Sequence, residues 1–517
     1  MTDPTPETGA GLHGIDWVII SIYVSAVIGI GWYYGCRQKS SDEYFVGNRG
    51  MNPILVGVSM FATLFSTITY LGIPGEYISK GPVIGLSMLS LPVVYLVVGY
   101  GLVPFYMRRR VTSAYELLEA ELGLSARMFA STLFVAIRLA WMAFLIYLPS
   151  NAILSMIGWE DDKLPWVVLV TGAVGILYAS IGGLRAVVIT DVLQFVLLLG
   201  GGFFVVASVT IALGGFSWFP TSWQDSWDTQ PFFSADPNVR ITVVGTLVGN
   251  VLWWVCTAGG DQTAIQRFMA TGSPQAARRS FLINTCSGAC VSVMLMMIGF
   301  SLLGYFQAFP ERLPAGQTLE TAADRLFPYY ISFAFPSGVA GLILSALFAA
   351  AMSSIDSGVN SITAVVLTDY VDRYRERPLA ERTRMLLAKW MAVSIGLIVV
   401  LLSAYVIKHV PGNYVGMAQR ITNLMISPLF VLFFIAIFVP FGTSFGAICG
   451  ALASSAAAVT VAYWEPIIET LGVRPEFLKT ISFQWIQPCA LTSGIVLGSV
   501  VSWFDSLLVR ECRTRAP

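Results

Sequence analysis

The stretch SFAFPSGVAGLILSALFAAAMSSIDSGV, residues 332–359, carries a single charged side chain, Asp356. A membrane-spanning α-helix needs about 20 consecutive, mostly apolar residues, and this stretch is long enough. The rest of the chain has the same character: of 517 residues, 56% are apolar and 12% are charged, with a mean hydropathy of +0.72. Soluble proteins have roughly a quarter of their residues charged. The sequence therefore predicts an all-α, polytopic membrane protein.

Apolar runs of this length occur about thirteen times, which predicts thirteen transmembrane helices. They cover residues 15–35, 51–78, 82–107, 128–157, 165–182, 187–213, 240–258, 280–308, 332–359, 385–407, 413–438, 443–463 and 483–505.

The distribution of positive charge predicts how these helices are oriented, because inner loops carry an excess of Lys and Arg. With the N-terminus outside, 20 Lys and Arg residues fall in inner segments and 8 in outer segments. One missed helix would invert every later loop, so the bias favours an N-terminus outside and a C-terminus inside. The absence of an Asn-x-Ser/Thr acceptor fits the plasma membrane of a bacterium, its inner membrane.

The overall charge and the histidine content exclude several classes of partner. Lys plus Arg and Asp plus Glu both number 30, so nothing predicts a nucleic-acid partner. The only histidines are His13 and His409, which excludes a His-based transition-metal centre. No catalytic constellation or repeated pore motif is present, so we expect neither an enzyme nor a channel.

Two predicted spans contain helix-breaking residues at matching positions, five helices apart. They are Gly72-Ile73-Pro74-Gly75-Glu76 and Thr257-Ala258-Gly259-Gly260-Asp261. Transporters built from inverted repeats interrupt one helix of each half near the membrane midplane, although Gly and Pro are also simply frequent in membrane helices. We expect a five-plus-five inverted repeat with additional helices at both ends. The predicted segments are an outer tail (1–14), an extra helix and inner loop (15–50), repeats at 51–213 and 240–438, two extra helices (443–505) and an inner tail (506–517).

Polar residues within spans are functional candidates because they are costly in lipid. Ser353, Ser354 and Ser357 share one stripe of the 332–359 helix, with Asp356 on the adjacent face. Hydroxyls together with carbonyl oxygens from a facing unwound helix suit a sodium ion, which prefers oxygen ligands. Serines in membrane helices also often bond to the carbonyl of their own helix.

Two further ionisable residues fall within predicted spans. Asp191, with Gln194 on the same face, is either a cation ligand or a cap near the inner end of its helix. Arg138 is a counter-ion for an anionic substrate, an internal partner of an acid such as Glu76, or a snorkelling residue near one interface.

Several motifs, in this order and spacing, resemble the sodium/solute symporter family over about residues 15–440. The segment Thr69–Glu76 resembles the monocarboxylate, multivitamin and iodide branch in particular. The motifs are Ser41-Asp42-Glu43-Tyr44-Phe45, Val111–Glu119, Gly182-Gly183-Leu184 with Thr190–Gln194, Asp261-Gln262 with Gln266-Arg267, and Ala350 with Ser353-Ser354, Asn360-Ser361 and Thr368-Asp369-Tyr370.

The resemblance implies a fold, a function and a set of sodium ligands. The family combines a ten-helix inverted repeat with extra helices and carries solutes by alternating access. Its usual sodium site would consist of the backbone carbonyls of Ala62, Phe65 and Ala350 and the hydroxyls of Ser353 and Ser354. A second cation site, present in some members, would use Thr63, Asp191, Asp356 and Ser357.

The substrate pocket departs from that of the sugar carriers. Three of the positions that hold polar ligands in those carriers are Leu64, Met88 and Leu91 here, and a hexose left without partners would lose several kcal/mol. We therefore expect a small organic anion such as a monocarboxylate; a neutral solute, and proton coupling on the same fold, are the alternatives. The expected partners are this solute, Na⁺ as coupling ion without other cofactors, and lipid, with no obligatory protein partner. The expected pocket residues are Thr69, Tyr70, Arg138, Trp254 and Gln419.

Overall fold

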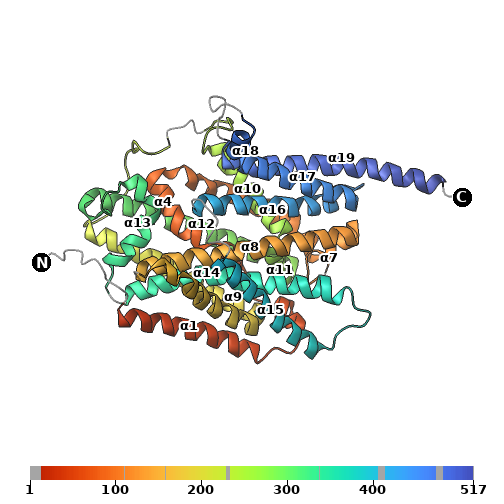
Figure 1. Cartoon of the computed structure of the whole chain (residues 1–517), viewed down its shortest axis with the longest axis horizontal. Coiled ribbons are helices and arrows are strands. Elements are labelled where there is room, and N and C mark those ends of the chain that lie inside the picture. Colours follow the sequence, from red (N-terminus) through yellow and green to blue (C-terminus); the bar gives the residue numbers. More distant parts are fainter. Residues whose placement is uncertain are drawn as a thin grey trace.

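The chain forms a bundle of long helices that run roughly along one common direction (Figure 1). The computed structural model describes residues 13–109, 111–157, 159–228, 233–336, 338–405, 414–472 and 481–515, which contain helices and no strands. Helix α1 lies along one edge of the bundle, and the two helices α17 and α19 lie along the opposite edge. The all-α prediction is confirmed.

Within these ranges, ten helical segments are long and apolar enough to cross a membrane. They are α1 (Gly14–Gly35), Pro82–Met107 (η2, α5, η3 and α6), α8 (Leu124–Ile157), α9 (Leu164–Ala212), α10 (Val243–Gly260), α12 (Pro274–Ala308), α14 with η6 (Val339–Asp372), α15 (Glu381–Tyr405), α17 (Ser444–Ala462) and Phe483–Leu508. The last of these consists of η9 (Phe483–Trp485) and most of α19 (Ile486–Arg515). A bent pair, α3 (Pro53–Leu64) and α4 (Thr67–Ser79), forms an eleventh.

The prediction of thirteen spans stays a prediction, and so does the orientation. Helix α9 covers two of the predicted spans, and its 49 residues would extend about 73 Å at 1.5 Å per residue, enough to cross roughly 30 Å of hydrocarbon twice. Gly183, with φ of 60°, interrupts its helical conformation between those two spans. Helix α16 (Tyr414–Phe438) corresponds to another predicted span, but most side chains of its first half lie outside the described part of the chain.

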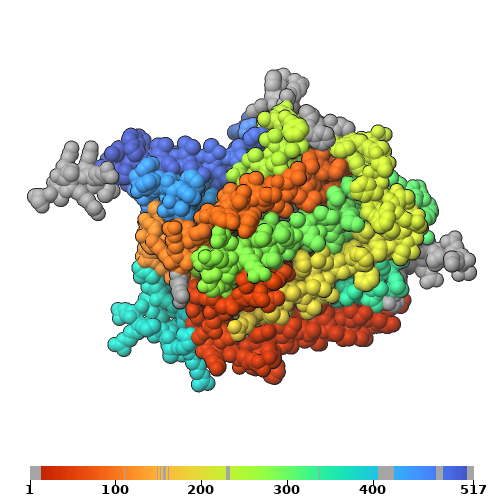
Figure 2. Space-filling view, turned by 180° about the vertical axis from the view of Figure 1, so that it is seen from behind, coloured from red at the N-terminus to blue at the C-terminus, as the bar shows by residue number. Residues whose placement is uncertain are grey.

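The outer faces of these helices are apolar, as contact with lipid requires. Trp32 of α1 is 64% exposed, Leu89 of η2 is 65% exposed and Phe203 of α9 is 68% exposed. Figure 2 shows one such face, on which the segment before Met107, α12, α9 and α1 lie side by side as oblique bands. A continuous exposed apolar surface of this kind would be a liability in water.

The first broken helix bends by 70° between α3 and α4. The interruption lies at Phe65 and Ser66, which have extended backbone angles, so our prediction of a break at Gly72–Glu76 is wrong. Pro74 lies inside α4, which continues through it. Ser66 caps the new helix, because its hydroxyl accepts a hydrogen bond from the amide of Thr69 at 3.2 Å.

The second broken helix is interrupted where the sequence predicts. Helix α10 ends at Gly260, Asp261 has extended angles (φ −89°, ψ 120°), and α11 (Gln262–Met269) follows. The carboxylate of Asp261 caps α11 by accepting from the amide of Thr263 at 2.7 Å. Both breaks therefore carry a capping side chain at the start of the second half-helix.

Shorter helices connect or cover the spans. They are α2 (Ser41–Val46), η1 (Gly47–Arg49), α7 (Glu116–Leu122), η4 (Asp161–Lys163), η5 (Pro310–Arg312), α13 (Leu319–Ala334) and α18 (Trp464–Thr470).

An ion network ties α7 to α8 and to the end of α14. Arg127 of α8 contacts both Glu119 of α7 and the fully buried Asp369 of η6, each at 2.5 Å. Arg373 also contacts Glu119, at 2.8 Å. Hydrogen bonds from Arg373, and then from Arg127, lower the pKa of Glu119 below its ordinary range. The network anchors one end of the helix that carries Ser353 and Ser354.

The opposite end of α14 is anchored by α1, which lies outside the predicted inverted repeat. The carboxylate of Asp16, which is buried, accepts hydrogen bonds from the amides of Gly338 and Gly341, both at 2.7 Å. Amides at the start of a helix have no partner within the helix, and negative charge there is also favoured by the helix dipole.

Replacing Asp16 with Ala should therefore destabilise the protein by about 1–2 kcal/mol, the usual range for a lost helix cap. Thermal unfolding in detergent measures this. Asp42→Ala is the matched control, because Asp42 is 54% exposed and its ion pair with Arg49 is 3.6 Å long; such pairs contribute little. Equal melting temperatures for the two variants would contradict the capping role.

Candidate functional site

The predicted sodium ligands meet where α14 faces the break between α3 and α4. The hydroxyl of Ser354 lies 2.9 Å from the carbonyl oxygen of Thr63 and 3.4 Å from that of Phe65. Both carbonyls belong to the C-terminal end of α3, whose last carbonyls have no partner within the helix. The dipole of α3 places partial negative charge at this end. The arrangement collects neutral oxygens in a buried place, which suits a monovalent cation.

The remaining predicted ligands lie beside this contact. Ala62 and Ala350 are both buried, and Ser353, one residue before Ser354, is 1% exposed. Ser353 donates its hydroxyl to Asp191 at 2.5 Å. The carbonyl of Thr63, rather than that of Ala62, makes the described hydrogen bond with Ser354. The structure thus brings the serine pair to the end of α3 and links it to Asp191.

Asp191 lies at the centre of a second cluster. Besides Ser353, its carboxylate accepts from the hydroxyl of Ser59 at 2.5 Å and lies 3.4 Å from that of Thr63. The hydroxyl of Thr63 is 2.8 Å from that of Ser357. Thr63, Asp191 and Ser357, predicted as cation ligands, are therefore together, whereas the alternative of a cap at the helix end does not describe Asp191.

Arg267 also joins this cluster, although the sequence pointed to it only as part of a family motif. Its side chain is buried, at 1% exposed. It forms an ion pair with Asp191 at 3.3 Å. The short helix α11 carries it back into the bundle after the break at Asp261. The sequence signal was a charged residue six positions after a helix-breaking Gly-Gly-Asp segment.

Asp356 is the fourth residue of the predicted second cation site. It is fully buried, and its hydrogen-bond partners differ from those of Asp191. Its carboxylate accepts from the hydroxyl of Tyr178 and from the amide of Ser357, both at 2.5 Å. Tyr178 belongs to α9, so Asp356 is hydrogen-bonded on the α9 side of α14. Asp191 and Asp356 thus flank Ser357 within one polar region.

A central cavity of about 250 Å³ adjoins the predicted sodium ligands through Phe65. Thr69 and Trp254, both predicted as pocket residues, line it. Tyr70 does not: it is fully buried and donates to the carbonyl of Leu198 at 3.2 Å. The side chain of Gln419 lies outside the described residues. Other lining residues include Phe61, Leu64, Ser87, Met88, Leu91, Asn250, Trp253, Gly288, Val291 and Ser292.

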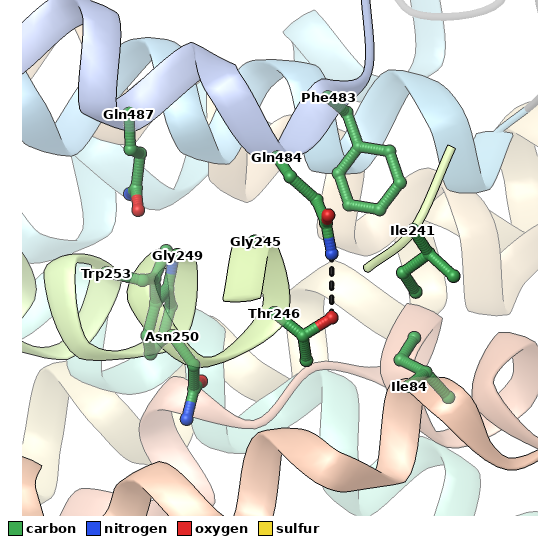
Figure 3. A pocket seen from close by; sticks show the side chains of 10 residues that line it. All are labelled: Ile84, Ile241, Gly245, Thr246, Gly249, Asn250, Trp253, Phe483, Gln484 and Gln487. Atoms are coloured by element: carbon green, nitrogen blue, oxygen red, sulfur yellow. Dashed lines mark hydrogen bonds between the residues drawn. The ribbon is translucent and has the colours of Figure 1, made fainter. Parts of the chain in front are cut away.

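A second cavity of about 240 Å³ adjoins the central one, with which it shares Ile84, Asn250 and Trp253. Figure 3 shows that it lies between α10 and the start of α19, with Gln484 and Gln487 reaching in from the α19 side. Gln484 donates to the hydroxyl of Thr246 at 2.7 Å. Helix α19 and the turn before it therefore contribute to the wall of this second cavity.

Arg138 lines a smaller cavity of about 40 Å³ beside the second break. It is 7% exposed and forms an ion pair with Asp261 at 3.2 Å, while its Nε has no hydrogen-bond partner. Of the three alternatives, snorkelling is therefore wrong. Arg138 is the internal partner of an acid, but that acid is Asp261, not Glu76.

Glu76 belongs to a separate cluster near the end of α4. Arg240 pairs with Glu76 at 3.0 Å and with Asp228 at 2.8 Å. Partial burial, reinforced by the charge of Glu76, raises the pKa of Asp324 on α13. These groups tie α4 to the segment before α10.

Comparisons with known proteins identify the family. Residues 44–454 match the model of the sodium:solute symporter family. The chain belongs to this family. The sodium/sialic acid symporter SiaT of Proteus mirabilis is 30% identical over 436 residues, covering 81% of this chain and 84% of that protein. Human sodium-coupled monocarboxylate transporter 1 is 26% identical over 427 residues, covering 81% and 68%.

Solved structures agree with this assignment. A substrate-bound, outward-open sodium-coupled sialic acid symporter has a TM-score of 0.77 and 27% identity, covering 95% of this chain and 98% of that one. The inward-facing transporter Mhp1, at 12% identity and a TM-score of 0.55, shares the fold. The chain is thus a multi-pass integral membrane protein and a sodium-coupled transporter rather than an enzyme, as the resemblance implied.

Filling the central cavity should stop transport without harming the fold. Gly288 lines the cavity, and a Cβ there would meet only the ring of Phe61 at an ordinary 3.6 Å. Gly288→Leu should lower the initial rate of sodium-driven uptake by about tenfold or more, since the solute loses its space, while helix propensity improves by up to about 1 kcal/mol. Gly200→Leu on α9, with nothing within 4 Å, is the matched control. Full uptake by the Gly288 variant in proteoliposomes would show that the solute passes elsewhere.

Proposed function

We propose that this protein is a sodium-coupled symporter of a small organic anion, a monocarboxylate being the best candidate. The observation that carries the coupling is the contact of the Ser354 hydroxyl with the carbonyls of Thr63 and Phe65. Phe65 also lines the central cavity. A sodium ion held there would join α14 to the break between α3 and α4 and order the wall of the solute cavity. Binding of either ligand would then favour binding of the other.

Loss of a serine hydroxyl provides the direct test of the sodium ligands. A hydrogen bond or ligand contact to a charged group contributes about 1.5–3 kcal/mol, so Ser354→Ala should raise the apparent sodium constant by roughly 10- to 100-fold. The solute constant at saturating sodium should change much less. Uptake into proteoliposomes at varied sodium concentration measures both constants.

Ser345→Ala serves as the control, because Ser345 is also buried on α14 but donates to the carbonyl of Gly341 in its own helix. A larger effect of Ser354→Ala on the solute constant than on the sodium constant would overturn the assignment. So would uptake that needs no sodium at all, the behaviour of a proton-coupled carrier.

The solute class is inferred from the cavity walls. Leu64, Met88 and Leu91 line the cavity, which leaves few partners for a sugar's hydroxyl groups. A volume of about 250 Å³ is below the roughly 300–1,000 Å³ of typical small-molecule sites, which favours a compact solute. Relatives are named for sialic acid and for monocarboxylates, both acids.

Arg138 is the residue that would recognise the acid. It is buried beside the break at Asp261, and its Nε is free to donate to a carboxylate oxygen. The ion pair with Asp261 keeps the guanidinium in place when no solute is bound. A solute carboxylate that reaches this small cavity, which is separate from the central one, would share the guanidinium with Asp261 and bind through its unpartnered Nε.

Uptake assays in proteoliposomes under a sodium gradient identify the class of solute that is transported. The radiolabelled solutes are lactate, pyruvate, sialic acid and glucose. We expect uptake of the monocarboxylates, with Arg138→Ala raising their Michaelis constant by about tenfold or more. Arg138→Ala leaves the buried carboxylate of Asp261 without its ion-pair partner, which can destabilise the fold. The second variant therefore combines Arg138→Ala with Asp261→Asn, because asparagine removes this charge and still caps α11. Normal uptake by both variants, or uptake of glucose alone, would rule out the anion proposal.

A further inference from the structure

The guanidinium of Arg267 lies among three of the four residues predicted to hold a second cation. Its Nη2 donates to the hydroxyls of Thr63 and Ser357, the latter at 2.6 Å, and lies 3.3 Å from the carboxylate of Asp191. Its Nε donates to the hydroxyl of Ser59 at 3.1 Å. One side chain from α11 thus contacts α3, α9 and α14 at once.

The donors and acceptors in this cluster are matched to a guanidinium. Arginine has five N–H donors, no acceptor, and a charge that persists at any physiological pH. Thr63, Ser357 and Asp191 offer oxygens, which are the atoms a metal cation would also need. A sodium ion bound to all three would have to displace the guanidinium or share its place with a second positive charge, which is strongly unfavourable in a buried site.

The charges in this region also balance with a single sodium ion. The buried charged groups that face one another are Asp191, Asp356 and Arg267; Tyr23 and Tyr178, which complete the polar wall on α1 and α9, are neutral. When both carboxyl groups are ionised, the two carboxylates and one guanidinium leave one negative charge. A sodium ion at the serine pair would neutralise it, and Ser353 connects that site to Asp191 through a 2.5 Å hydrogen bond.

We propose that Arg267 takes the place of the second coupling cation, so that this protein binds one sodium ion per transport cycle. The proposal rests on the sodium site at Ser353 and Ser354. Arg267 is part of the chain and does not cross the membrane with the solute, so it supplies charge neutrality but no driving force. At 100 mV each additional sodium would multiply accumulation about 50-fold, so a transporter with Arg267 in this place reaches a lower maximum accumulation than one that carries two sodium ions.

Equilibrium binding of ²²Na⁺ to the purified protein in detergent tests the proposal without knowledge of the solute. We expect one sodium ion per wild-type chain and two per Arg267→Gln chain, because glutamine vacates the charge position while retaining a hydrogen-bonding side chain. Arg267→Lys keeps the charge and should bind one. Arg185→Gln, which removes an arginine that is 39% exposed and pairs with Glu43, is the control and should also bind one.

The sodium counts distinguish a failure of the Arg267 proposal from a failure of the proposed sodium site. Two sodium ions in the wild type or in Arg267→Lys overturn the role of Arg267, whether or not the glutamine variant folds. One sodium ion in a folded Arg267→Gln chain overturns it as well. Failure of the wild type to bind any sodium, by contrast, contradicts the sodium site at Ser353 and Ser354 itself.

Discussion

The structure depends on one constraint: backbone groups released by a broken helix inside a membrane must find partners within the protein. Ser66 and Asp261 cap the second half of each broken helix, and Ser354 donates to the carbonyls at the end of α3. The side chains that satisfy the broken backbone therefore lie beside the groups that we propose to bind sodium and solute. The need to satisfy the interrupted backbone explains why the central cavity, the serine pair and the Arg138–Asp261 ion pair all lie beside a break.

Buried charged side chains are also paired with partners within the protein. The buried Asp and Arg side chains of the described residues lie against an opposite charge, hydroxyls or backbone amides, because an uncompensated charge costs several kcal/mol. Arg127 with Asp369, Arg138 with Asp261 and Arg267 with Asp191 are three such pairs, each joining segments far apart in the sequence.

Much of this could be predicted from the sequence, because apolar run length and helical spacing are local properties. The stripe of Ser353, Ser354 and Ser357 follows from the period of the helix, and the second break follows from a Gly-Gly-Asp segment. The first break did not follow from Gly and Pro, since Pro74 is accommodated inside α4. A search for capping residues would have pointed to Ser66. The partners of Arg138 and Arg267 depend on how distant helices pack, which no local pattern encodes.

Helix α1 lies outside the predicted repeat, but it contacts the helix that carries the serine pair. Asp16 holds the first amides of α14, and Gly341 packs so closely against Asp16 that a Cβ there would lie 2.6 Å from its Cα. These contacts tie the start of α14 to α1. If α14 tilts during transport, α1 would tilt with it through the surrounding lipid, and the thickness and viscosity of the bilayer would then affect the turnover rate.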